Sequence, residues 1–405
     1  MTNPNNISLN ISHALKFIDS HALNIPTLTI LGENGEILEG ATAPDIDQET
    51  ALNLYSTMRF IRLLDERMQA AQRQGRVSFY MQCLGEEAAI TASAAALKPE
   101  DMIMAQYREQ AALAYRGFTL EQFMNQLFSN EKDLGKGRQM PVHYGSNELH
   151  YLTISSPLGT QIPQATGYAY GQKLKHIDPK TGELSSEIDN LTICYFGEGA
   201  ASEGDFHAGL NMAAVHEAPV LFFARNNGYA ISTPADEQFK GDGIASRGVG
   251  YGIKTIRVDG GDALAVFAAT QAARKMAVEN GEPILIESIA YRLGAHSTSD
   301  DPSGYRSKEE EAEFKDSCPI ERYKKWLLKQ GWLNEQEDEA EKDKIREDIL
   351  AALKVAEKIQ KPALEELVSD VYDQPIPALQ KQYEELKEHI KQHPEAYPVT
   401  AGRIK

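Results

Sequence analysis

Short apolar segments alternate with amphipathic ones through the middle of this 405-residue chain, and the alternation limits the fold more than any other feature. Segments with the length and composition of buried strands lie at residues 102–106, 191–196, 220–224, 252–258 and 284–290. Segments with the character of helices lie at residues 48–74, 86–97, 120–128, 162–175, 203–216 and 263–279. Strands and helices that alternate in this way form a parallel sheet with helices on both faces. We therefore predict an α/β fold.

The two ends of the chain differ from this middle part. Residues 1–46 are polar and irregular, with a hairpin predicted at 28–38 around the turn Asn34-Gly35. We interpret them as an arm that embraces a partner subunit. Beyond residue 300, charged amphipathic helices dominate, and we interpret their charge runs as solvated faces. The predicted division is an N-terminal arm at 1–46, an α/β domain at 47–310 and a C-terminal helical region at 311–405.

Composition argues against several classes of protein. The formal net charge is −18, whereas non-specific binding to nucleic acid needs clustered Lys and Arg. No apolar run approaches the roughly 20 residues that span a membrane. The three cysteines lie far apart, without the spacing of a zinc site or a disulfide framework, and we interpret them as small buried side chains. This cysteine usage fits a reducing compartment.

The N-terminal segment shows no pattern of a sorting signal. It has no basic region followed by an apolar core, and the first arginine of the chain is Arg59, so an Arg-rich transit peptide is not expected. We predict a bacterial cytoplasmic protein. The alternative is the mitochondrial matrix, for a processed organellar form.

Polar and glycine residues follow two of the predicted strands. Gly197-Glu198-Gly199 ends the first strand and Asn226-Asn227 follows the next, with one helix and one returning strand between them. Ligands of parallel sheets bind beyond the carboxyl ends of the strands. The glycines permit close approach of a ligand to the backbone, and the following helix N-terminus suits a diphosphate. A carboxylate, an amide oxygen and a backbone carbonyl at this edge match Mg²⁺.

The order Gly-Glu-Gly and then Asn-Asn resembles the thiamine diphosphate fingerprint, which usually begins Gly-Asp-Gly. Glu198 replaces that Asp; it is one methylene longer, still reaches a metal, and is typical of the branched-chain branch. The same resemblance extends over the stretches at 106–109, 135–143, 155–161 and 291–297. From about residue 50 to its end, the chain is similar to the alpha subunits of the branched-chain 2-oxoacid (2-oxoisovalerate) dehydrogenases. These are oxidoreductases of branched-chain amino acid catabolism that use lipoamide as acceptor.

The resemblance implies roles for individual residues. Arg108 would hold the diphosphate, and Leu158 would support the bent thiamine. The cofactor-binding set as a whole is Gln106, Tyr107, Arg108, Ser156, Leu158, Gly199, Ala200, Arg225, Ile231 and His296. The Mg²⁺ ligands would be Glu198, Asn227 and the carbonyl of Tyr229. A K⁺ site would consist of Ser155, Pro157, Thr160 and Gln161.

The loop at 291–297 carries two further implied roles. His296 would be the catalytic acid/base in transfer of the acyl group to lipoamide. Ser297 matches the phosphorylation site of the mitochondrial enzymes, and a phosphate there would place negative charge beside the diphosphate.

The chain also implies partners, because one α/β sheet supplies only the diphosphate half of such a site. The resemblance places the pyrimidine half, with its glutamate, in a beta subunit. We therefore expect a heterotetramer of two alpha and two beta chains, inactive without beta, that works with a lipoyl-bearing acyltransferase core and a 2-oxoacid substrate. We expect neither a nucleic acid nor a membrane as partner.

Two other interpretations stay open. A pyruvate or acetoin dehydrogenase alpha subunit would have the same fold, but Glu198 and the Gln-Tyr-Arg-Glu stretch at 106–109 argue against it. A non-catalytic subunit could keep the fold without the chemistry. Loss of Glu198, Asn227, Arg108 or His296 would be its sign, and all of them are present.

Overall fold

A six-stranded parallel sheet forms the centre of the computed structural model, which describes residues 13–19, 22–184, 186–315 and 318–397. The strands follow the order β1 (Thr27–Leu28), β7 (Lys254–Asp259), β8 (Ile284–Ile289), β4 (Val220–Asn226), β3 (Thr192–Gly197) and β2 (Met102–Met104). Every neighbouring pair is parallel. The predicted α/β fold is confirmed, and the five predicted strands lie within two residues of β2, β3, β4, β7 and β8 at each end.

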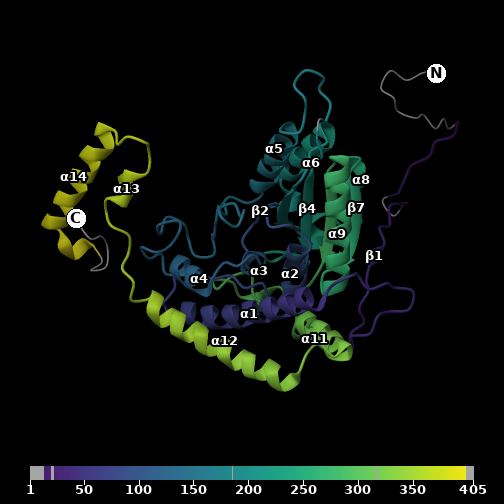
Figure 1. The fold of residues 1–405 in the computed structure, drawn as a ribbon, viewed down its shortest axis with the longest axis horizontal. Helices are drawn as coiled ribbons and strands as arrows, with labels where there is room; N and C mark the ends of the chain where they lie inside the picture. The colour runs from purple at the N-terminus through teal and green to yellow at the C-terminus, as the bar shows by residue number, and fades with distance from the viewer. Residues whose placement is uncertain (1–12, 20–21, 185, 316–317, 398–405) are drawn as a thin grey trace.

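Helices cover both faces of this sheet (Figure 1). Along β3, Ile193 and Tyr195 belong to the core cluster that includes α1 (Gln48–Arg73), α2 (Glu87–Ala95) and α9 (Ala263–Asn280). Cys194 and Phe196 point to the other face, into the cluster of α5 (Gln161–Leu174) and α6 (Gly204–His216). This alternation follows from the two-residue period of a strand. β3 is therefore apolar on both faces.

The remaining elements are short or lie at the edge of the domain. The short helices are α3 (Gln110–Tyr115), α4 (Leu120–Leu127), α7 (Ala235–Gln238) and α8 (Ala245–Gly250). A small antiparallel pair is formed by β5 (Tyr229–Ala230) and β6 (Thr233–Pro234), and single 3-10 turns lie at Ala200–Ser202, Pro302–Gly304 and Pro394–Ala396. Residues 129–160, all of them described, contain no helix and only isolated bridges.

Part of the N-terminal arm belongs to the sheet. The predicted hairpin is present as an antiparallel bridge between Leu31 and Ile37. Before it, β1 pairs in parallel with β7, in the register Thr27 to Arg257. We did not predict this pairing, because two residues are too few to show a strand period. The proposed contact of the arm with a partner subunit stays a prediction, and residues 1–12 lie outside the described part.

The C-terminal helices divide into two groups (Figure 1). After α10 (Lys308–Lys315), α11 (Pro319–Gln330) and α12 (Glu335–Ala356) bury Tyr323, Leu327 and Leu353 in the core cluster of α1. By contrast, α13 (Glu366–Ser369) and α14 (Pro377–Gln392) have no buried residue and stand apart from the sheet at the left of Figure 1. The division into arm, domain and helical region stays a prediction.

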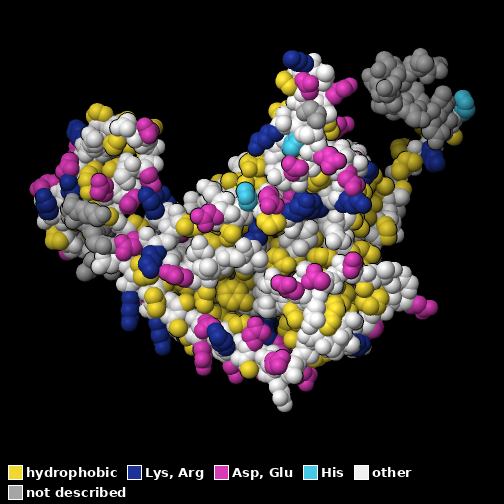
Figure 2. All heavy atoms as spheres, viewed as in Figure 1, with side chains coloured by type: hydrophobic (Ala, Val, Ile, Leu, Met, Phe, Trp, Pro, Cys, Tyr) yellow, Lys and Arg dark blue, Asp and Glu magenta, His cyan; other side chains and the backbone are white. Residues whose placement is uncertain are grey.

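The surface carries charges of both signs. On the face drawn in Figure 2, Lys and Arg side chains are interspersed with Asp and Glu. Within the described residues, none of the helices has the length and apolar character to cross a membrane. Cys83 and Cys194 are buried, as predicted, whereas Cys318 is half-buried.

Asp262 joins the arm to the sheet and supports a prediction. Its fully buried carboxylate caps α9 at the N–H groups of Leu264 and Ala265 and also accepts the N–H groups of Ile30 and Leu31 at 2.6 Å. Replacing Asp262 by Ala removes the cap and leaves two buried donors unpaired. We expect a loss of about 3 kcal/mol or more in the free energy of unfolding, measured by urea denaturation.

The control is Asp47→Ala, which removes the exposed cap of α1 at Thr50. This change should lower the free energy of unfolding by less, because water can replace the lost acceptor. Equal losses for the two variants would contradict the role of Asp262.

Candidate functional site

The carboxyl ends of β2, β3 and β4 open into one cavity of about 290 Å³. It is lined by twelve of the side chains or turns expected at the cofactor and Mg²⁺ sites: Gln106, Tyr107, Arg108, Leu158, Glu198, Gly199, Ala200, Arg225, Asn227, Tyr229, Ile231 and His296. Ser156 lies outside the lining, and its hydroxyl is 2.9 Å from Nε2 of His143. Segments far apart in the sequence thus meet where the strand order predicted a ligand site.

The Gly-Glu-Gly turn at 197–199 lies very close to the neighbouring segments. The side chain of Gln106 accepts the N–H of Gly197 at 2.9 Å, which ties β2 to the end of β3. A Cβ on Gly199 would lie only 2.8 Å from Cβ of Ala230, so a larger residue would push the two segments apart. After the turn, the backbone continues through the 3-10 turn into α6, and Ser202 and Glu203, which precede α6, also line the cavity.

Glu198 and Asn227 lie side by side, as predicted from their strand ends. Glu198 is 1% exposed, and its carboxylate accepts the backbone N–H of Asn227 at 3.4 Å. Burial raises the pKa of Glu198, and no Lys or Arg side chain of the described part forms an ion pair with it. A buried carboxylate that lacks a paired cation, next to an amide oxygen, fits a bound Mg²⁺.

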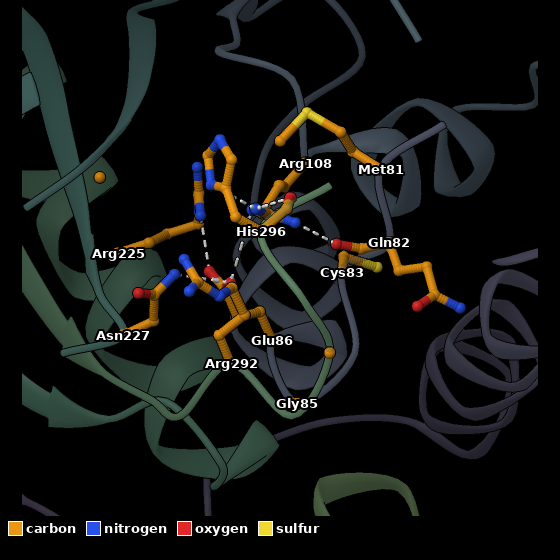
Figure 3. Close-up of polar contacts among 12 residues, drawn as sticks. Met81, Gln82, Cys83, Gly85, Glu86, Arg108, Arg225, Asn227, Arg292 and His296 are labelled. Carbon is orange, nitrogen blue, oxygen red and sulfur yellow. Dashed lines mark hydrogen bonds and ion pairs between the residues drawn. The ribbon is translucent and has the colours of Figure 1, made fainter. Parts of the chain in front are cut away.

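Arg225 is a buried cation held by two acids. Its Nη1 donates to Glu86 at 2.6 Å (Figure 3). Its Nε donates to Glu109. The second oxygen of Glu109 accepts the backbone N–H groups of Gln106 and Arg108, so the same carboxylate shapes the loop after β2. The segment after β2, the end of β4 and the start of α2 are thereby joined beneath the cavity.

Arg108 determines how His296 is oriented. Its Nη2 donates to the carbonyl of His296 at 2.6 Å and lies 3.2 Å from Nδ1 of the same residue (Figure 3). An arginine can only donate, so Nδ1 must be the acceptor, and we infer that neutral His296 carries its proton on Nε2. Burial, and then the charges of Arg108 and Arg292, lower the pKa of His296 to about 4.

Comparison with known proteins places this site in a family. A family model described as the dehydrogenase E1 component matches residues 55–365. The chain belongs to this family. It is 47% identical, over 95% of its length and 79% of the relative, to "2-oxoisovalerate dehydrogenase subunit alpha 2, mitochondrial" of Arabidopsis thaliana. The corresponding alpha subunits of Mus musculus and Homo sapiens are 47% and 48% identical over 95% of this chain, which covers 85% and 84% of them.

In this E1 component chain, three of the predicted K⁺ residues, Ser155, Pro157 and Thr160, precede α5, and the fourth, Gln161, is its first residue. The hydroxyl of Thr160 donates to the carbonyl of Pro157 at 3.3 Å, and Nε2 of Gln161 donates to the carbonyl of Tyr195 at 3.0 Å. The assignment of K⁺ to these residues stays a prediction.

Ser297 lies next to His296 in a short turned loop. Its hydroxyl accepts the N–H of Ser299 at 3.3 Å, and Asp300 accepts the N–H of His296 at 2.7 Å. Phosphorylation of Ser297 stays a prediction.

Sequence reasoning missed three charged residues of this site. Glu86 and Glu109 precede α2 and α3, where an acid is ordinary near a helix N-terminus. Glu86 therefore carries no functional signal in the sequence, and Glu109 carries one only through its place in the stretch at 106–109. Arg292 donates to the carbonyls of Ile231 at 2.6 Å and Tyr229 at 3.4 Å. It holds Ile231 at φ 58°, a left-handed conformation that is costly for a β-branched residue. In the sequence, the one feature that indicates a role for Arg292 is its place in the stretch at 291–297.

The lowered pKa of His296 gives a prediction for pH. The folded chain keeps His296 neutral down to about pH 4, whereas the unfolded chain protonates near the ordinary value of 6.5. Between these values the unfolded state binds more protons, so stability should fall as the pH falls through this window. We expect the melting temperature of the wild type to drop relative to that of His296→Asn between pH 6.5 and 4. Parallel melting curves for the two proteins over this range would contradict the assignment.

Proposed function

We propose that this E1 component chain is the alpha subunit of a thiamine diphosphate-dependent dehydrogenase that oxidatively decarboxylates branched-chain 2-oxoacids and transfers the acyl group to a lipoyl domain. The observation that carries the proposal is the pairing of Glu198 with Asn227 in a cavity that also contains Arg108, Arg225 and His296. The names of the similar proteins, all 2-oxoisovalerate dehydrogenase alpha subunits, support the substrate class.

Different residues of the cavity would bind the metal and the diphosphate. Glu198, Asn227 and the carbonyl of Tyr229 would hold Mg²⁺, which shares its remaining positions with phosphate oxygens and water. Arg108 and Arg225 would supply positive charge for the diphosphate. When bound, thiamine diphosphate supplies an electron sink for decarboxylation.

His296 is suited to donate a hydrogen bond into the cavity. Its Nδ1 faces Arg108, which leaves Nε2–H as the free end of the ring. At neutral pH the ring is uncharged, because its pKa is lowered to about 4. A neutral imidazole in this tautomer would stabilise developing negative charge on a substrate oxygen by a hydrogen bond from Nε2–H.

The proposal includes a beta subunit and the rest of the complex. Leu158 and Ile231 line the cavity but remain 38% and 54% exposed, so the apolar wall for an aromatic ring is open on one side. A beta chain that covers this side would complete the site in a heterotetramer with two copies of each chain. A lipoyl-bearing acyltransferase core would then receive the acyl group.

The cellular compartment is a separate part of the proposal. The similar proteins of Arabidopsis, mouse and human are named mitochondrial. For this chain we propose the bacterial cytoplasm, with the mitochondrial matrix as the alternative. Residues 1–12 of the chain lie outside the described part.

The test is turnover by the chain co-expressed with its beta partner, with thiamine diphosphate and Mg²⁺. We expect 3-methyl-2-oxobutanoate and 4-methyl-2-oxopentanoate to be decarboxylated faster than pyruvate. Glu198→Ala should reduce turnover at least 100-fold, because it removes the carboxylate of the Mg²⁺ site.

Glu183→Ala is the control, since Glu183 is an exposed acid in the loop before β3. A preference for pyruvate would overturn the substrate class and favour the pyruvate dehydrogenase alternative. No turnover by an assembled, cofactor-loaded complex would favour a non-catalytic subunit.

A further inference from the structure

Glu86 touches three residues of the proposed cofactor site without lining the cavity itself. It directly precedes α2 and is fully buried. Its carboxylate accepts Nδ2 of Asn227 at 2.9 Å and Nη1 of Arg225 at 2.6 Å, and it lies 4.0 Å from Nε of Arg108 (Figure 3). We infer that Glu86 is a positioning residue, which fixes the side-chain amide of Asn227 so that Oδ1 faces the cation. This inference rests on the proposed function.

The chemistry of the amide carries the argument. One end of the Asn227 side chain only donates hydrogen bonds and the other only accepts them. A fully buried carboxyl group beside two guanidinium groups is ionised, because a buried arginine needs a charged partner, and a carboxylate only accepts. The amide nitrogen must therefore face Glu86.

The orientation of the oxygen follows from that of the nitrogen. Oδ1 points away from Glu86 and accepts the backbone N–H of Tyr229 at 3.3 Å. The reversed amide would place Oδ1 against the Glu86 carboxylate and would present its N–H groups to Mg²⁺. Both contacts would be repulsive, and Mg²⁺ takes oxygen ligands.

Glu86 also shares Arg225 with Glu109, and the two acids can be separated by experiment. Glu109 accepts Nε of Arg225 but makes no contact with Asn227. A change at Glu109 loosens the arginine alone, whereas a change at Glu86 affects the arginine and the amide. Any effect that depends on the amide should therefore be specific to Glu86.

Glu87 is a matched control for burial. It is the next residue, is also fully buried, and pairs with Arg62 of α1 at 2.6 Å instead of with the site. Its other oxygen accepts the N–H of Gly85. If Glu86 acted only by stabilising the start of α2, Glu87→Gln and Glu86→Gln would have similar effects on the site.

The experiment measures Mg²⁺ affinity in the complex of this chain with its beta partner. With thiamine diphosphate saturating, Mg²⁺ is titrated and the concentration for the half-maximal rise in melting temperature is recorded. Outer-shell partners of a metal ligand are typically worth about 10- to 100-fold in affinity. We expect Glu86→Gln to raise this concentration about 10-fold or more, and Glu87→Gln to leave it within about 3-fold of the wild type.

A second substitution makes the test specific. Asn227→Asp replaces the amide by a carboxylate, which presents oxygen to the cation in either orientation. Alone, it places two carboxylates against each other at 2.9 Å and should weaken binding. In the double variant with Glu86→Gln, the glutamine amide can donate to the new carboxylate, so the Mg²⁺ affinity should return toward that of the wild type. The same substitution should not rescue Glu109→Gln.

The outcomes separate this inference from the proposed function. A wild-type complex that shows no Mg²⁺-dependent stabilisation overturns both. A wild type that responds, with Glu86→Gln unchanged, overturns the inference alone. The double variant also overturns the inference if, without Mg²⁺, its melting temperature equals that of the wild type and its Mg²⁺ affinity nevertheless does not recover. Should Glu86→Gln fail to fold, the double variant gives the decisive comparison.

Discussion

The site depends on one buried arginine, Arg225, held between the carboxylates of Glu86 and Glu109. All three side chains are at most 2% exposed, so their charges are removed from water. They are stabilised by one another, by Arg108, and by hydrogen bonds to the two carboxylates from the Asn227 amide and from backbone N–H groups. Removing one partner of such a group typically costs 3–5 kcal/mol, because it leaves a buried charge uncompensated. The group therefore fixes the positions of the segments that carry it: the loop after β2, the start of α2 and the end of β4.

A second network holds the loop of His296 over the same cavity. Arg306 donates to the carbonyl of Gly294 at 2.7 Å and to that of Arg292, and it lies 5.6 to 5.8 Å from the ring centres of Tyr229, Tyr291 and Tyr305. The hydroxyl groups of Tyr229 and Tyr291 both donate to Glu310 on α10. Because Tyr229 also supplies a proposed Mg²⁺ carbonyl, the metal site and the histidine loop share one support. A disturbance of this loop should therefore reach the metal site.

The sequence allowed the sheet and much of the cavity to be predicted, for a physical reason. Strands buried on both faces, such as Val220–Asn226, are nearly continuous apolar runs, and the residues after them must lie at one edge of the sheet. Ion pairs between side chains distant in the sequence leave no such pattern in it. Glu86 and Arg225 are separated by most of the domain, and an acid at a helix start looks the same whether it faces solvent or an arginine. The parallel pairing of β1 with β7 was hidden similarly, since its two residues have no period.

The two sides of the cavity differ in how firmly they are held. The side toward the sheet is rigid, because Glu198, Asn227 and Arg225 are almost fully buried and lie at the ends of strands. The outer side is formed by Leu158 and Ile231, which are exposed and lie on turns. Ile231 is kept in a strained left-handed conformation by the hydrogen bond from Arg292 to its carbonyl. Strain of this kind persists only where neighbouring contacts over-determine the backbone. Ile231 is apolar and strained, and about half of its surface is open to solvent. Its side chain becomes fully buried only when another molecule binds over it. The cavity thus has the construction expected for one half of a site: charges and proposed metal ligands lie on the side of this chain, and the apolar wall is open toward the outside.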